Sequence, residues 1–294
     1  MSTNPAFCST WRCPNCGAPL QKVANTWQCE NKHSFDCAKQ GYVNLLLSNQ
    51  KNSKAPGDNY DMVMARRSFL NQGFYSPLSE HLASRCLKKY AESSPISDFS
   101  LFDAGCGEGY YLQTVYSLLK NERQTREASI SKNLLAYGID ISKPAIQAAA
   151  RTYKDIECAV ASTFNLPVLD ESQDCLLQVF APSSKEEVYR VLKSDGLWIA
   201  VNPAEQHLHQ LKQLVYDKPN DHKVSTAIPP GFTRLEQTNL SFDLSLATPE
   251  QRAHLLMMTP FYWTVSEQKK QTLLKVLSTV TASFDIQVLQ KCLA

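Results

Sequence analysis

The fold of this chain is decided by one stretch, Leu101-Phe102-Asp103-Ala104-Gly105-Cys106-Gly107-Glu108-Gly109. Its first four residues are mostly apolar, which predicts a buried strand, and the alternating glycines that follow allow a tight turn. A helix is expected directly after the turn, because the N–H groups at a helix start can approach a bound molecule closely. The stretch therefore predicts a strand, a glycine turn and a helix that together bind a cofactor.

The spacing of Gly105, Gly107 and Gly109 narrows the choice of cofactor. A dinucleotide-binding turn would have a glycine at position 110, where this chain has Tyr110, and a P-loop would continue with Gly-Lys-Ser or Gly-Lys-Thr. Neither pattern fits. The G-x-G-x-G turn after an acidic strand instead resembles that of the Rossmann-like methyltransferases, in which it holds the methionine end of S-adenosylmethionine.

A second strand is predicted over residues 136–142, and it contains Asp140 near its end. A carboxylate at this position is suited to accept hydrogen bonds from both hydroxyls of a ribose. The separation from Gly109 exceeds the usual spacing of about 20 residues, and a polar insertion over residues 121–133 accounts for the extra length. Asp140 is therefore a candidate ligand of the cofactor.

Strands and helices alternate through the rest of the domain. We expect them at residues 145–153 (helix), 157–161 (strand), 175–180 (strand), 186–192 (helix) and 197–202 (strand). This order predicts an α/β fold of the Rossmann-like class I methyltransferase type, with a doubly wound, mostly parallel sheet and a ligand cleft at the carboxyl ends of its strands. Ala161 and Ser162 stand where many such enzymes have an acidic residue, so the contact with adenine is undefined.

The front of the chain has the spacing of a zinc site, with Cys13 and Cys16 in a C-x2-C pair and Cys29 and His33 in a C-x3-H pair. Two such turns can bring four donors together around a tetrahedral zinc ion. A structural zinc would also stabilise a small module by about 10–16 kcal/mol. Because all four positions are filled by the protein, the site is expected to be structural. The alternative is that these are ordinary reduced cysteines and a surface histidine.

Length and charge predict the organisation of the chain. At 294 residues, against a usual domain size of roughly 100–200, we expect a main domain with a smaller attachment. We divide the chain into a zinc-binding RNA-recognition module (1–45), a linker and helical segment (46–95) and a methyltransferase domain (96–294). Residues 1–60 carry six Lys and Arg against three Asp and Glu, a net charge of +3, which favours this end as the side that faces RNA.

The sequence also predicts a location. The N-terminus lacks a basic start and an apolar run, and no stretch approaches the roughly 18 apolar residues of a membrane span. Ten cysteines in a chain of this size fit reduced thiols or metal ligands better than disulfides. We expect a cytoplasmic protein that acts on neither membranes nor DNA.

Between the two domains, residues 51–58 form a polar, turn-rich stretch that predicts an exposed linker. A helical pattern over residues 60–69 includes Arg66 and Arg67, and Tyr75 lies at the entrance of a second helix that runs to about residue 90. The two arginines could hold phosphate oxygens of RNA, because guanidinium groups match phosphate geometry. The alternative is a face that is solvated or paired with acidic groups of the same chain.

Taken together, these motifs resemble the bacterial large-subunit ribosomal RNA guanine-N(1)-methyltransferase family over nearly the whole chain. The matching pieces are the zinc pattern and residues 41–46, 56–58, 65–70, 106–111, 180–182, 207–208 and 258–261.

The resemblance implies that the protein uses S-adenosylmethionine to methylate a guanine in a 23S rRNA hairpin, which the zinc module helps to grip. It also implies that Tyr75, Gly107, Glu108 and His207 contact the cofactor, and that the protein forms a homodimer. Without the resemblance, Tyr75 would be assigned to core packing and His207 to a helix surface. Of the family's subtypes we favour the guanine(745) enzyme over the guanine(748) enzyme that confers macrolide resistance.

For the chemistry, we expect in-line attack of the guanine N1 on the methyl group, so that orientation supplies much of the rate. A splayed base could stack on Phe180, Tyr110 or Tyr111. The sequence Phe180-Ala181-Pro182-Ser183 replaces the motif typical of enzymes that methylate exocyclic amines, in agreement with a ring-nitrogen target. No catalytic residue is assigned. The competing functions are a small-molecule methyltransferase and a non-enzymatic, zinc-dependent RNA-binding protein.

Overall fold

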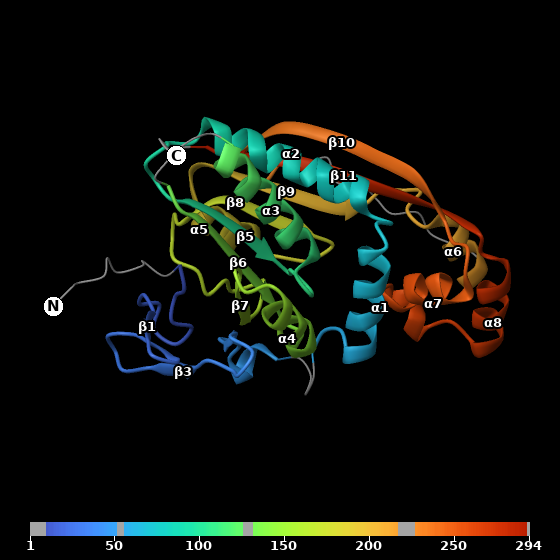
Figure 1. The fold of residues 1–294 in the computed structure, drawn as a ribbon, viewed down its shortest axis with the longest axis horizontal. Coiled ribbons are helices and arrows are strands. Elements are labelled where there is room, and N and C mark those ends of the chain that lie inside the picture. The colour runs from blue at the N-terminus through green and yellow to red at the C-terminus, as the bar shows by residue number, and fades with distance from the viewer. Residues whose placement is uncertain (1–9, 52–55, 126–131, 217–226, 293–294) are drawn as a thin grey trace.

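The strand before the glycine turn, β5 (Phe99–Ala104), lies in the middle of an eight-stranded sheet. The computed structural model describes residues 10–51, 56–125, 132–216 and 227–292. The sheet has the order β10-β11-β9-β8-β5-β6-β7-β4 (Figure 1). Its other strands are β4 (Val43–Asn44), β6 (Leu134–Asp140), β7 (Glu157–Val160), β8 (Gln173–Val179), β9 (Leu192–Pro203), β10 (Phe232–Ser245) and β11 (Thr279–Lys291).

Helices follow the strands as the alternating sequence pattern predicts. They are α1 (Tyr60–Asn71), α2 (Ser76–Glu92), α3 (Tyr110–Thr125), α4 (Lys143–Thr152), α5 (Lys185–Val191), α6 (His209–Val215), α7 (Pro249–Met257) and α8 (Glu267–Val276), with short 3-10 helices η1 (Ser48–Gln50) and η2 (Pro260–Trp263). None of the helices in the described ranges is both long and apolar enough to cross a membrane.

The pairing of the strands creates a cleft at the end of β5. This strand pairs in parallel with β6 on one side and with β8 on the other, and β6–β7 and β8–β9 continue in parallel outward. After β5 the chain therefore adds β6 and β7 on one side of this strand, and it later adds β8 and β9 on the other side. Such a switch point opens a ligand crevice at the carboxyl ends of the strands. The predicted doubly wound, mostly parallel sheet is confirmed, with an antiparallel β10–β11 hairpin at its edge.

Alternating side chains of β5 belong to two separate cores. Phe99 and Leu101 lie in the core that also contains buried residues of α2, α3 and α4, whereas Phe102 and Ala104 lie in the core on the other face. This second core includes residues of α5 and of the N-terminal segment, Trp11 among them. Both faces of the sheet are thus covered, as burial of a parallel sheet requires.

The N-terminal segment folds as a three-stranded sheet, β1 (Gln21–Val23), β2 (Thr26–Gln28) and β3 (Ser34–Asp36), and then enters the central sheet. Strand β4 pairs in parallel with β7. Trp11 is buried, and its Nε1 donates a hydrogen bond to the Glu157 carboxylate at 3.0 Å. Its ring packs edge-on against that of Tyr137, with 5.5 Å between the ring centroids. The small module therefore lies against β6 and β7, as the blue segment beside β7 in Figure 1 shows.

Helix α1 follows the N-terminal segment and leads into the helices and strands of the central sheet. It starts at Tyr60, where the side chain of Asn59 accepts a hydrogen bond from the Met62 amide, an N-cap that satisfies a free donor. At its other side α1 packs against α7, part of a helical lobe between β10 and β11 that also contains α8 (Figure 1). This arrangement places α1 between the cleft and the lobe.

Candidate cofactor and zinc sites

The glycine turn is fixed by the end of β6. The amides of Gly105 and Cys106 both donate to the carbonyl of Ile139, at 2.9 and 2.8 Å. Gly105 has φ of +95°, and a Cβ at this position would collide with the side chain of Ala181. Only glycine satisfies both conditions, so the turn brings bare backbone to the carboxyl edge of the sheet.

A cavity of about 290 Å³ opens at this turn. Its walls come from the glycine turn, the end of β6, the loop after β7, the end of β8, helix α1 and the segment before it. The lining residues are Gly57, Asp58, Val63, Arg66, Gly105, Gly107, Glu108, Asp140, Ile141, Ser142, Ala145, Ser162, Thr163, Phe164, Val179, Phe180, Ala181 and Pro182. Gly57 and Asp58, expected in an exposed linker, thus form part of the wall.

Asp140 lines this cavity, and its carboxylate accepts hydrogen bonds from two backbone amides. One carboxylate oxygen accepts from the Gly107 amide at 3.0 Å and the other from the Ser142 amide at 2.7 Å. Burial raises the pKa of Asp140, while these two amides act in the opposite direction. A carboxylate can accept further bonds, so the position suits the ribose contact predicted from the sequence.

Two other buried carboxylates flank the turn. Glu108 lines the cavity, and burial raises its pKa to about 7, with Arg67 and Arg66 lowering it. Asp103 is buried behind the turn, and burial followed by the charge of Asp140 raises its pKa to about 8. In the described part of the chain, neither carboxylate has a hydrogen-bond partner. Asp103 was not predicted as a site residue, although an acidic residue at the end of the strand before the glycine turn was a signal for it.

Three of the predicted cofactor contacts do not line the cavity. Tyr75 is buried among the rings of Phe69, Phe242 and Phe284, which is the packing position considered for it above. Gly109 lies against the ring of Tyr153.

His207 is also buried, and its Nδ1 accepts from the Ser283 amide at 3.2 Å. Its ring lies 5.9 Å from that of Phe180, which does line the cavity. His207 therefore stands one layer behind the wall. The roles of Tyr75, Gly109 and His207 toward a cofactor stay predictions.

The two arginines of α1 both face acidic side chains of the same chain. Nη2 of Arg66 lies 2.6 Å from Asp58, and Nε of Arg67 lies 3.8 Å from Glu108. Of the two interpretations left open above, this geometry favours intramolecular pairing. Arg66 is in addition part of the cavity wall.

A second hollow of about 30 Å³ adjoins the first and shares Arg66, Glu108 and Phe180 with it. Tyr110 and Tyr111 form its other side, with Tyr111 buried.

Phe180 itself is 37% exposed, and its φ is +56°. This left-handed conformation is costly for a bulky residue, and such strain concentrates at functional sites. Of the three aromatic residues considered for base stacking, Phe180 lines both cavities, whereas Tyr110 and Tyr111 line the second cavity only.

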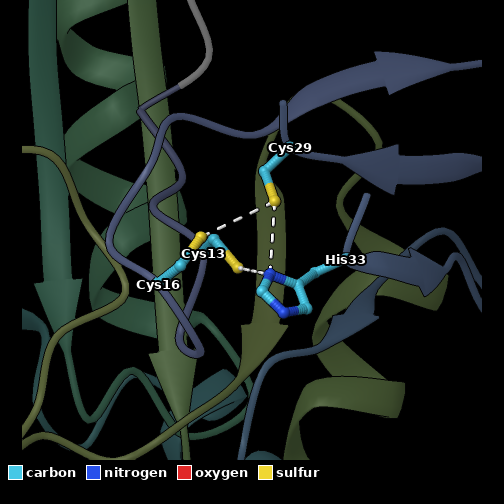
Figure 2. A group of neighbouring side chains, drawn as sticks. All are labelled: Cys13, Cys16, Cys29 and His33. Atoms are coloured by element: carbon cyan, nitrogen blue, oxygen red, sulfur yellow. Dashed lines mark hydrogen bonds between the residues drawn. The ribbon is translucent and has the colours of Figure 1, made fainter. Parts of the chain in front are cut away.

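Four side chains of the N-terminal module converge on one point (Figure 2). The donor atoms of Cys13, Cys16, Cys29 and His33 all lie within 4.8 Å of one another. Sγ of Cys16 and Cys29 are 3.7 Å apart, and Nδ1 of His33 is 3.6 Å from Sγ of Cys13 and 3.5 Å from Sγ of Cys29. A zinc tetrahedron with bonds of about 2.3 Å to sulfur has sulfur–sulfur edges of about 3.8 Å. The four donors therefore fit zinc.

The backbone forms the two turns that hold these donors. The Gly17 amide donates to the Cys13 carbonyl at 2.8 Å, and the Lys32 amide donates to the Cys29 carbonyl at 3.0 Å. The side-chain amide of Asn31 donates to Cys16 Sγ at 3.3 Å and is the largest contribution to lowering the pKa of that thiol to about 6. All cysteines in the described ranges are free thiols, and Cys37 lies outside the cluster.

Both parts of the chain match known protein families. Residues 11–54 match the zinc-ribbon family model described as "RlmA, N-terminal", and residues 97–271 match the family model "Methyltransferase domain". The 23S rRNA (guanine(748)-N(1))-methyltransferase of Streptomyces fradiae is 34% identical over 257 residues, which cover 86% of this chain and 85% of that relative. The protein YxjB of Bacillus subtilis (strain 168), provisionally named a 23S rRNA (guanine-N(1)-)-methyltransferase, is 31% identical over 96% of each chain. Among solved structures, the YcgJ protein from Bacillus subtilis has a TM-score of 0.46 and 12% identity over 73% of this chain and all of its own.

Because the strand order, the glycine turn and the matched domain agree, the protein is a methyltransferase of the Rossmann-like class I, as the sequence predicted. The relatives narrow the group further, since the identity extends over more than four fifths of both chains. The chain belongs to the 23S rRNA guanine-N(1)-methyltransferase family.

Proposed function

We propose that this methyltransferase transfers the methyl group of S-adenosylmethionine to N1 of a guanine in a 23S rRNA hairpin. The observation that carries the proposal is the cavity at the end of β5, which combines a bare glycine turn, carboxylates and the exposed ring of Phe180. The names of the relatives support the class of substrate.

The cavity fits the parts of such a donor. The carboxylate of Asp140 suits its ribose, the bare backbone at Gly105 allows close approach, and the acidic wall at Glu108 suits its positive charge. Gly105, Gly107, Asp140 and Glu108 would hold the molecule directly, whereas Tyr75, Gly109 and His207 would act from behind the wall. When bound, the sulfonium supplies a methyl group that is activated for displacement.

The protein's contribution to the transfer is mainly orientation. The ring of Phe180, exposed at the cavity, would stack on the splayed guanine and present N1 to the methyl group. A bond forms between N1 and the methyl carbon, the bond from that carbon to sulfur breaks, and the N1 proton leaves to solvent. Holding the reacting atoms in line can contribute roughly 7–11 kcal/mol in favourable systems. We assign no general base.

The N-terminal module would bind zinc through Cys13, Cys16, Cys29 and His33, in a structural role because every position is taken by the protein. Its surplus of Lys and Arg favours contact with the rRNA hairpin. We keep the division into residues 1–45, 46–95 and 96–294 as part of the proposal, together with a cytoplasmic location and a homodimer. We also keep guanine(745) as the proposed position within the hairpin.

Mass mapping of methylated RNA tests the proposal. Zinc-loaded protein is incubated with the donor and protein-free large-subunit rRNA, and the RNA is digested and sequenced by mass spectrometry. We expect one N1-methylguanine in one hairpin, and no product with Asp140→Ala. Methylation of the neighbouring guanine would assign the other subtype, and methylation of small molecules without RNA would replace the proposal by the competing enzyme class.

A further inference from the structure

Within the part of the chain that the structure describes, Arg66 is the one cation of the cavity walls. Among the described residues that line the two cavities, no other lysine or arginine occurs, whereas Asp58, Glu108 and Asp140 are acidic. A positively charged donor explains the acidic groups. It does not explain why a guanidinium lies among them.

The position of Arg66 is fixed from two sides. Its Nη2 donates to the Asp58 carboxylate at 2.6 Å and to the Met258 carbonyl at 3.4 Å. Asp58 is itself anchored, because Ser142 Oγ donates to the Asp58 carbonyl at 2.6 Å. The guanidinium is therefore held at the wall between the segment before α1 and the helical lobe.

This anchoring leaves hydrogen-bonding capacity unused. Nε of Arg66 is buried and has no acceptor within the described ranges. A guanidinium has five N–H donors in a planar fork that matches a carboxylate. A buried donor without an acceptor is costly, so a ligand that supplies one would be favoured here.

Glu108 completes a pair of opposite charges at the same place. It lines both cavities together with Arg66, and both of its carboxylate oxygens are buried without a hydrogen-bond partner in the described part of the chain. Arg67 is the nearest cation to Glu108, at 3.8 Å, which is too long for a hydrogen bond. The unused Nε of Arg66 and the carboxylate of Glu108, which accepts no hydrogen bond within the described ranges, together match a ligand that carries a carboxylate and an ammonium on one carbon. That is the free end of an α-amino acid.

We infer that Arg66 binds the α-carboxylate of the donor's methionine end, with Glu108 facing its ammonium group. The inference rests on the proposed use of S-adenosylmethionine and assigns Arg66 to the cofactor, not to RNA phosphate. Asp58 is then a positioning residue, because its carboxylate accepts from Nη2 of Arg66 and so orients the guanidinium. Asp140 and Ser162 line the same cavity and would hold the adenosine.

Calorimetric titrations of the wild-type and variant proteins with two ligands test the inference. S-adenosylhomocysteine carries the amino-acid end, whereas 5′-methylthioadenosine has the same adenosine and sulfur without it. Arg66→Ala is expected to weaken S-adenosylhomocysteine by roughly tenfold to a hundredfold, the range for a hydrogen bond to a charged group. Its affinity for 5′-methylthioadenosine is expected to stay unchanged.

Arg85→Ala is the matched control. Like Arg66, Arg85 pairs with a carboxylate at 2.6 Å, here Glu236, and its side chain is 32% exposed against 29% for Arg66. It does not line either cavity, so both ligands should bind as in the wild type. Arg66→Lys keeps the charge but loses the planar fork, so it should weaken the binding of S-adenosylhomocysteine and leave that of 5′-methylthioadenosine unchanged. If thermal unfolding shows that Arg66→Ala is not folded, Arg66→Lys provides the test in its place.

Equal weakening of both ligands, or no weakening of either, overturns the inference. So does an Arg66→Ala protein with unchanged donor affinity and reduced affinity for rRNA, since the arginine would then serve a phosphate. If the wild-type protein binds neither ligand, the cavity is not a donor site, and the proposed function is wrong as well. Failure of the inference and failure of the proposed function are thus distinguished by the wild-type titration.

Discussion

Glu108 links the ionisation of one side chain to cofactor binding. Burial raises its pKa to about 7, so the carboxyl group is partly protonated near neutral pH. A cationic donor favours the ionised form, and below this pKa binding must also remove the proton. Donor affinity should therefore rise with pH across about 6 to 8.

Calorimetry of S-adenosylmethionine binding across this pH range measures the effect. In Glu108→Gln the rise should be reduced and the affinity lower throughout. An affinity that is constant with pH in the wild type, or that falls as pH rises, would show that Glu108 does not face the positive charge.

Phe180 is the residue for which an RNA-specific effect is expected. Stacking of a base on an aromatic ring is worth about 1–3 kcal/mol. Phe180→Ala should therefore reduce kcat/KM for rRNA by roughly 5- to 150-fold, while the affinity for S-adenosylhomocysteine stays near that of the wild type. Phe180→Tyr retains the ring and should retain most of the activity. A Phe180→Ala protein that loses donor affinity as much as RNA methylation would contradict this role.

At the scale of elements, the glycine turn depends on a close contact between two loops. Gly105→Ala forces a Cβ into Ala181 at a φ of +95°. Gly41 has a similar φ of +102°, but a Cβ there would meet nothing within 4 Å. Comparison of the two alanine variants separates the clash from the backbone strain, which alone costs about 1–2 kcal/mol.

We expect Gly105→Ala to lose measurable binding of S-adenosylhomocysteine and Gly41→Ala to bind it normally with slightly lower thermal stability. Calorimetry and thermal unfolding of both variants provide the measurement. Normal donor binding by Gly105→Ala would mean that the turn can move away from Ala181, and that its shape is not what holds the cofactor.

Elements were predictable from the sequence where local pattern decides them. The strand at Phe99–Ala104, the turn after it and the helix at Lys143–Thr152 follow from apolar runs, glycines and the alternation of strands and helices. The long hairpin of β10 and β11 was not predicted, because its pairing brings together segments separated by the helical lobe. Periodicity within one segment contains no information about such a partner.

The same limit applies to the site. Asp140 and the glycines were found because each lies at the end of a strand that the local pattern predicts, and Asp140 accepts from the turn as its strand position suggests. Asp58 was assigned to an exposed linker, since a polar, turn-rich segment predicts a loop but not the surface on which the loop lies. Only the tertiary contacts with Ser142 and Arg66 place it at the cavity.

At the scale of the whole molecule, the zinc module is part of the covering of the sheet. Trp11 lies in the core of the second face and contacts Glu157 and Tyr137. Loss of the metal should therefore affect more than the module itself. We expect about one zinc per chain in the wild type, less than about half in Cys16→Ser, and a lower unfolding temperature in the variant.

Cys37→Ser provides the control, because Cys37 is near the module's strands but outside the four-residue cluster. Metal analysis of purified protein and thermal unfolding before and after chelation give the comparison. Full zinc content in Cys16→Ser, or equal loss in Cys37→Ser, would exclude the assigned ligand set.

Both the proposed methyl transfer and the role of Arg66 require that the cavity at the end of β5 binds a sulfonium methyl donor. The most direct measurement is a calorimetric titration of zinc-loaded, full-length protein with S-adenosylhomocysteine, the product left after transfer. We expect saturable binding of one molecule per chain that disappears in Asp140→Ala. A titration with no heat of binding at several temperatures, on protein shown to be folded and metal-replete, would contradict it.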